Sequence, residues 1–206
     1  VVLGGIFVLS SKNDPGQGST TAATKHVEGK GSTGITFQEY GDYQCPVCGS
    51  FYPAVKEVQT KYNDQLFFQF SNLPLTSLHP NAFAAARAAE AAGLQNKYFD
   101  MYDLLYRNQQ VWSSSSSSET IFTGYARELG LNTTQFKADF ASSKVNTAIN
   151  ADIAAFKKTG NDQATPTFFL DGKKINNTDL FDKNNQPSVE KFSKLIDAAI
   201  AAKKKQ

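Results

Sequence analysis

The chain contains 206 residues, of which 40% are hydrophobic and 19% are charged, and its formal net charge is +2. These fractions are typical of a globular protein with one core and exclude a disordered or fibrous chain. The small net charge does not favour nucleic-acid binding, and no apolar run reaches the roughly 20 residues that a membrane-spanning helix needs. We therefore expect a soluble, compact protein with a single core that binds no nucleic acid, and we take it to be a monomer.

The first 34 residues have two parts. Residues 1–9 are apolar apart from two glycines, and we interpret them as the remnant of a signal peptide or membrane anchor; an ordinary N-terminal strand is the alternative. Residues 10–34 are rich in Gly, Ser, Thr and Lys and have few apolar residues, so they bury too little apolar surface to fold, and we expect a flexible tether. This order predicts an extracytoplasmic domain held at the outer face of a membrane.

Strand and helix signals alternate after the tether. Residues 35–40 alternate apolar and polar side chains, which predicts a strand. From Phe51 to Tyr62, apolar residues recur at helical spacings, and Pro46 suits the first turn of that helix. Residues 66–70 are almost wholly apolar and predict a buried second strand, so the segment has the order β-α-β.

Helical patterns fill the long interval that follows, which is more chain than a βαβ connection needs. Apolar spacing and helix-end signals predict five helices. They cover approximately residues 81–93, 98–105, 121–130, 132–140 and 145–160. Six consecutive serines at residues 113–118 predict a mobile surface loop.

The C-terminal part returns to β-structure. Residues 167–170 predict a strand, Asp171 and Gly172 favour a tight hairpin, and residues 173–175 predict its second strand. Apolar spacing over residues 189–200 predicts a closing helix. The complete order is β-α-β, a helical block, then β-β-α.

The strongest chemical signal is Cys-Pro-Val-Cys at residues 45–48, where a predicted strand gives way to a helix. Unpaired backbone N–H groups and the helix dipole stabilise a thiolate there, and cysteines in such motifs have pKa values lowered to roughly 3.5–7.5. Cys45 is therefore the expected nucleophile. Cys48 lies one turn further on, where the helix shields it, and is the expected resolving thiol.

Two other interpretations of the cysteine pair stay open. A purely structural disulfide would close only a very short loop and constrain the chain little. Half of a zinc site would need two further ligands, for which only His26 and His79 are present. We expect neither a metal nor a dissociable cofactor, because the cysteines themselves carry the electrons.

Two motifs and the region between them carry a resemblance to a known family. The first motif is Asp-Tyr-Gln-Cys-Pro-Val-Cys at residues 42–48, preceded by Phe37, and the second is Ala-Thr-Pro-Thr-Phe-Phe-Leu-Asp-Gly at residues 164–172. Between them, residues 79–82, 85–93 and 98–112 also match. Over approximately residues 35–202, the chain resembles the DsbA-like thiol–disulfide oxidoreductases of the thioredoxin superfamily.

The resemblance implies a fold and a domain division. The expected fold is an α/β thioredoxin fold, β-α-β…β-β-α, with an inserted all-helical subdomain. The thioredoxin-like domain would comprise residues 35–75 and 161–203, and the inserted domain residues 76–160. Residues 1–34 would precede both as anchor or signal remnant and tether.

The resemblance also implies roles for the site residues. Pro166 should be cis and lie against the cysteine pair, and Pro46 and Val47 form the active-site dipeptide. Thr165 would offer backbone groups to an extended substrate segment, as in β-strand addition; a plain place at the start of a strand is the alternative. The apolar surface near Pro46, Val47 and Pro166 would receive unfolded segments.

Glu39 and His79 each have a functional and a structural interpretation. Members of the superfamily often keep a buried acid beneath the cysteines as a proton shuttle, and Glu39 is the candidate for that role. Because the parity of its strand is not evident, we favour a solvated position for Glu39. We interpret His79 as part of a turn that leads into a helix rather than as a general base. Trp112, Tyr98 and Tyr102 are expected to be packing residues.

For function, the resemblance implies an extracytoplasmic enzyme, in the periplasm or at the outer face of the cytoplasmic membrane. It would introduce disulfide bonds into unfolded, cysteine-containing exported proteins, and a membrane reoxidase of the DsbB or VKOR type would restore its disulfide. One alternative is a reductase or disulfide isomerase that uses the same cysteine pair. Another is a non-catalytic peptide-binding module, for which Cys45→Ser would leave function intact.

The residue before the second cysteine gives a first prediction. The best-known family member has a histidine where this chain has Val47, which has neither charge nor donor in its side chain. Val47→His should therefore stabilise the Cys45 thiolate and raise the reduction potential of the pair. Redox titration of both proteins measures the effect, and equal potentials would contradict it.

Overall fold

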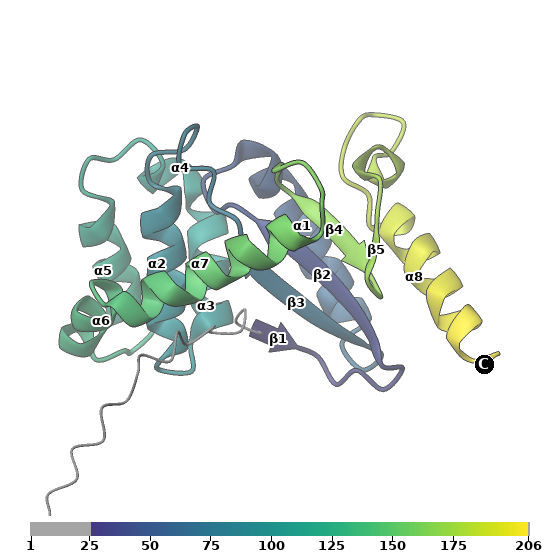
Figure 1. Cartoon of the computed structure of the whole chain (residues 1–206), viewed down its shortest axis with the longest axis horizontal. Helices are drawn as coiled ribbons and strands as arrows, with labels where there is room; N and C mark the ends of the chain where they lie inside the picture. Colours follow the sequence, from purple (N-terminus) through teal and green to yellow (C-terminus); the bar gives the residue numbers. More distant parts are fainter. Residues whose placement is uncertain (1–25, 206) are drawn as a thin grey trace, which may run out of the picture.

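A five-stranded mixed sheet forms the centre of the structure, a computed structural model that describes residues 26–205 (Figure 1). The strands are β1 (His26–Glu28), β2 (Ile35–Gly41), β3 (Leu66–Asn72), β4 (Thr167–Leu170) and β5 (Lys173–Lys174). Their order across the sheet is β1-β3-β2-β4-β5. Strands β2 and β3 are parallel, whereas β1, β4 and β5 each run antiparallel to a neighbour.

Eight α-helices and one short 3₁₀ helix surround the described sheet. They are α1 (Pro46–Lys61), α2 (Ala82–Gly93), α3 (Tyr98–Arg107), α4 (Gln109–Trp112), α5 (Ser118–Glu128), α6 (Thr133–Phe140), α7 (Ser143–Lys158), η1 (Asn177–Leu180) and α8 (Val189–Lys203). Helix α1 joins β2 to β3 and α8 follows β5, with α2 to α7 between the two halves. The expected thioredoxin fold with helices inserted between its β-α-β and β-β-α parts is therefore confirmed.

The two faces of the sheet carry different layers (Figure 1). On β2, Ile35, Phe37 and Glu39 share one face, and Ile35 and Phe37 belong to the main core with helix α1. Tyr40 points to the opposite face, where its ring lies 5.0 Å from Phe156 of α7. This alternation follows from the two-residue period of a strand. It fixes which β2 side chains lie beneath the start of α1.

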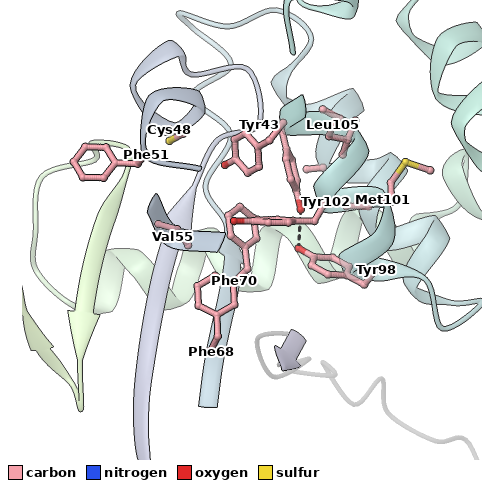
Figure 2. Packing of buried hydrophobic residues seen from close by; sticks show 14 of the residues in the cluster. Tyr43, Cys48, Phe51, Val55, Phe68, Phe70, Tyr98, Met101, Tyr102 and Leu105 are labelled. Carbon is pink, nitrogen blue, oxygen red and sulfur yellow. Dashed lines mark hydrogen bonds between the residues drawn. The ribbon is translucent and has the colours of Figure 1, made fainter. Parts of the chain in front are cut away.

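One hydrophobic cluster runs through both the sheet and the inserted helices. Figure 2 shows Tyr102 of α3 directed toward Phe70 of β3, and their ring centroids are 5.0 Å apart. Beside them, the hydroxyl of Tyr43 donates a hydrogen bond to that of Tyr98 over 3.2 Å. Trp112 is fully buried. The packing roles expected for Tyr98, Tyr102 and Trp112 are confirmed, and they join the helical block to the sheet.

The tether prediction was wrong for its last nine residues. Residues 26–28 form β1, which pairs with β3, and the following turn is held by a 2.7 Å hydrogen bond from Lys30 N–H to the Asn63 carbonyl. The His26 ring stacks on Tyr98 with centroids 3.4 Å apart. A three-residue edge strand anchored by a histidine ring has no apolar period to detect. Residues 1–25, including the apolar stretch 1–9, lie outside the described residues.

The serine-rich loop also differs from its prediction as a mobile surface loop. The Asn81 side-chain amide donates hydrogen bonds to the carbonyls of Trp112, Ser113 and Ser115, at 3.3, 3.1 and 2.9 Å. These bonds use backbone carbonyls, which every residue has, so the composition of the loop does not reveal them. Helix α5 then begins within the serine run, at Ser118.

No helix among residues 26–205 is both long enough and apolar enough to cross a membrane.

Candidate active site

The cysteine motif lies where β2 ends and α1 begins. Cys45 is the N-cap residue of α1, with Pro46 in the first helical turn. Its N–H donates to the Asp42 carbonyl over 3.1 Å, and its own carbonyl accepts the first helical hydrogen bond, from Gly49 N–H, over 3.0 Å. Cys48 lies one turn into the helix and is fully buried. Both are free thiols in this structure, in the positions expected for a nucleophile and a resolving thiol.

The two thiols have opposite proton affinities. The pKa of Cys45 is lowered from 9.0 to about 5, first by a hydrogen bond from the Cys48 thiol and also by backbone N–H groups of Cys48 and Val47, against a burial effect that raises it. Burial raises the pKa of Cys48 well above its ordinary value. At neutral pH the Cys45 sulfur is therefore a thiolate that the Cys48 thiol hydrogen-bonds, which is the charge arrangement of an activated cysteine pair.

The loop before β4 completes the sulfur site. The Thr165–Pro166 peptide bond is cis. When protonated, the Cys45 thiol donates to the Thr165 carbonyl over 3.4 Å, although 120 residues separate the two in sequence. The Asn177 side chain of η1 donates to the Pro166 carbonyl over 2.7 Å. The structure thus brings Thr165 and Pro166 to the cysteine pair.

The exposed apolar surface at this site is smaller than we expected. Pro46 and Val47 are exposed, and 47% of Val47 is accessible to solvent. Pro166, in contrast, is buried. Any contact with a bound chain from this loop must therefore come from Thr165 and the exposed residues before it.

Glu39 is buried, so our preference for a solvated position was wrong. Only 1% of it is exposed, because it shares the α1-facing side of β2 with Ile35 and Phe37. Burial, and secondly the charge of Cys45, raise the pKa of this carboxyl from 4.5 to about 8. The Glu39 charge in turn helps to raise the pKa of Cys48. The structure therefore places this acid beneath the cysteine pair, and its Oε2 has no hydrogen-bond partner among the described residues.

Asp42 and His79 form a second polar group near the motif. The buried Asp42 carboxylate accepts hydrogen bonds from the N–H groups of Gln44 and Leu75, at 2.8 and 2.9 Å. Its Oδ2 lies 2.7 Å from Nδ1 of His79. The His79 carbonyl also accepts a bond from Ala82 N–H at the start of α2, so His79 does occupy the turn that leads into a helix. Its ring braces the Asp42 turn.

Gln109 contacts the motif directly, although no pattern in the sequence assigns it a role. Its side-chain amide donates to the carbonyls of Tyr43 and Cys45, at 2.7 and 2.9 Å. Its place in the family-like segment 98–112 was the only signal in the sequence. A cavity of about 400 Å³ opens beside this contact, and Gln44, Pro46, His79 and Gln110 are among its lining residues.

The two histidines considered as zinc ligands are paired with carboxylates. His26 Nε2 lies 2.9 Å from Glu90 Oε1, and His79 pairs with Asp42 as described. Within residues 26–205, no group of three or more His, Cys, Asp or Glu side chains is arranged to hold a metal ion.

The burial of Glu39 predicts a pH-dependent stability. Its folded-state pKa of about 8 exceeds the ordinary 4.5, so the folded state binds this proton more tightly and the free energy of unfolding falls as pH rises between those values. Glu39→Gln should remove roughly 3–5 kcal/mol of that fall. Denaturant unfolding from pH 5 to 8 measures it, with the exposed Glu57→Gln as control. Parallel stability profiles for wild type and Glu39→Gln would refute the prediction.

The comparisons with known proteins agree with this geometry. A protein-family model described as thioredoxin matches residues 21–198. The Na⁺/H⁺ antiporter NhaA 1 of Salinispora arenicola is 36% identical over 149 residues, which are 72% of this chain and 22% of that protein. A Mycobacterium antiporter of the same name is 36% identical over 153 residues, 24% of its length. The chain thus spans less than a quarter of these curated relatives.

Several solved structures have the same fold. A thioredoxin-like oxidoreductase from Silicibacter pomeroyi has a TM-score of 0.66 at 25% identity, over 85% of this chain and 91% of that one. BdbD from Bacillus subtilis has a TM-score of 0.70 at 21% identity, over 86% and 93%. The α-DsbA1 of Wolbachia pipientis has a TM-score of 0.70 at 20% identity, over 87% and 92%. The chain belongs to the thioredoxin family, and its fold is that of the DsbA-type thiol–disulfide oxidoreductases.

Proposed function

We propose that this protein is a thiol–disulfide oxidoreductase that works as an oxidase and introduces disulfide bonds into exported proteins. The observation that carries the proposal is the stabilised thiolate of Cys45, whose pKa is about 5. A stabilised thiolate favours the reduced state of the enzyme, and a stable reduced state makes the disulfide a strong oxidant. The same thiolate is a good leaving group when a substrate disulfide forms.

The reaction begins with the Cys45–Cys48 disulfide. A substrate thiolate attacks the Cys45 sulfur, a substrate–Cys45 disulfide forms, and the Cys45–Cys48 bond breaks with its electron pair on Cys48. A second substrate thiolate then attacks the substrate sulfur of the mixed disulfide and releases Cys45 as a thiolate. Two substrate thiols are oxidised to a disulfide, and the enzyme disulfide is reduced to a dithiol. The buried position of Cys48 keeps it from being the sulfur that is attacked.

Glu39 is the proton donor for the first step in this proposal. Cys48 leaves as a thiolate in a buried site that strongly favours its protonated form. A carboxyl with a pKa of about 8 still carries its proton at neutral pH, so Glu39 can supply the proton that Cys48 takes up. In the reverse direction it accepts the same proton.

The mouth of the site offers an apolar surface for an unfolded chain. Val47 is 47% exposed, and Leu78 and Val111, neighbours of cavity-lining residues, are 71% and 63% exposed. Backbone groups of Thr165 would pair with an extended substrate segment, and the cavity beside Pro46 would receive one of its side chains. Main-chain pairing with few specific pockets suits substrates of many sequences.

We further propose that the enzyme acts outside the cytoplasm as a monomer, next to a membrane that holds its reoxidase. Disulfides persist in such oxidising compartments. The antiporter relatives support a place beside a membrane, since their matching segments belong to membrane transport proteins by name. A partner of the DsbB or VKOR type would take the two electrons from the Cys45 and Cys48 thiols and restore the disulfide.

Redox titration against glutathione tests the oxidase assignment. We expect a potential near the oxidising end of the range of about −270 to −120 mV that such proteins span, and oxidation of a reduced, unfolded protein in a stoichiometric assay. Cys45→Ser is the blank and should do neither. A potential near −270 mV would instead favour a reductase, and no titratable pair would leave only a peptide-binding module.

A further inference from the structure

Gln109 connects the inserted helices to the nucleophilic cysteine. It lies at the start of α4, 64 residues from Cys45, and is 8% exposed. A side-chain amide has two N–H donors, and Gln109 uses its nitrogen to donate to two carbonyls of one turn, those of Tyr43 and Cys45. Both acceptors belong to the residues immediately before α1.

The Gln109 amide occupies the space that a side chain at Gly49 would need. A Cβ atom added to Gly49 would lie 2.5 Å from Gln109 Oε1, closer than real Cβ contacts, and 3.0 Å from its Cδ, so the Gln109 amide would have to shift. Gly49 sits in the helical interior, where glycine costs about 1 kcal/mol relative to alanine. The absence of a side chain there lets the Gln109 amide reach the Cys45 carbonyl.

Gln44, which lies between Tyr43 and Cys45, is also held by residues of the helical insertion. Gln44 donates from its side chain to the Ser113 carbonyl over 2.7 Å, and its Oε1 accepts from Asn81 N–H over 2.6 Å. Each of the three residues at positions 43–45 is therefore bonded to the helical insertion. Such bracing holds a reacting group in place only if the supporting residues are themselves fixed, and Asn81 is fixed by its bonds to the serine loop.

From this arrangement we propose that Gln109 is a positioning residue for Cys45, through which the inserted helices set the redox equilibrium of the cysteine pair. By holding the Cys45 carbonyl, it keeps Cys45 at the N-cap of α1, where the backbone N–H groups of Val47 and Cys48 lower the pKa of its thiol. Those groups stabilise the thiolate, so they favour the reduced protein. If Cys45 is no longer held at the N-cap, the thiolate of the reduced protein loses this stabilisation. The oxidised protein, which has no thiolate, loses nothing.

Two variants test the proposal from opposite sides of the contact. Gln109→Leu removes the two donors and puts an apolar side chain of similar size in their place. Gly49→Ala keeps the glutamine at position 109, but the added methyl group displaces its amide from the Cys45 carbonyl. Each should lower the equilibrium constant for reduction of the protein by glutathione by about tenfold. Each should also destabilise the reduced form more than the oxidised form in denaturant unfolding.

The matched control is Gln95→Leu. Gln95 also exchanges hydrogen bonds with a distant backbone segment, at Asn132, but outside the active site. This variant should leave the redox equilibrium constant unchanged. The proposal is wrong if the redox equilibrium constant of Gln109→Leu or Gly49→Ala stays within twofold of the wild-type value and both redox forms are destabilised equally. It is also wrong if Gln95→Leu shifts the constant as much as these variants do.

The proposal rests on the proposed redox role of Cys45, and the same measurements separate the two. A wild-type protein with no titratable pair would refute the redox role itself. If the wild-type pair titrates and the Gln109 and Gly49 variants have the same redox equilibrium constant as wild type, only the positioning role is refuted. Because Gly49→Ala carries no loss of buried hydrogen-bond donors, it keeps the test valid if Gln109→Leu does not fold.

Discussion

The stabilisation of one negative charge, on the sulfur of Cys45, is the interaction on which the rest of the site depends. The shift of its pKa from 9.0 to about 5 corresponds to roughly 3 kcal/mol in favour of the reduced folded state at pH 7. No lysine, arginine or histidine is among the main causes of that shift. The Cys48 thiol and backbone N–H groups in the first turn of α1 stabilise the thiolate, so the geometry of the strand-to-helix junction carries the chemistry.

The surroundings of the cysteine pair keep the Cys48 thiol protonated. Beneath α1, the β2 face and the α3 aromatics enclose Cys48 and Glu39 in a dry region, where Tyr102 and Tyr106 are also almost fully buried. Burial raises the pKa values of both Cys48 and Glu39. The same insertion that contributes these aromatic rings also contributes Gln109 at the rim. The inserted helices therefore act on both cysteines, through exclusion of water on one and hydrogen bonding on the other.

The sequence predicted the features that depend on local pattern. Cysteine spacing and Pro46 located the start of α1, and Asp171 with Gly172 located the β4–β5 hairpin, where both residues have positive φ angles of 47° and 79°. Features set by distant partners were missed. Glu39 was misplaced because strand parity shows its direction only once the partners of β2 are known. Strand β1 was missed because three residues at a sheet edge carry no period, and Gln109 because its partners are backbone carbonyls 64 and 66 residues away.

The strand-to-helix junction holds Cys45 as a thiolate, and titration of the ultraviolet thiolate absorbance of the reduced protein measures this. A variant with serine at both cysteine positions is subtracted as the blank. We expect one thiolate that appears with a midpoint near pH 5, and no second thiolate up to well above pH 9, because Cys48 is buried. A midpoint close to the ordinary value of 9.0 would contradict it, since the site would then hold Cys45 as a neutral thiol.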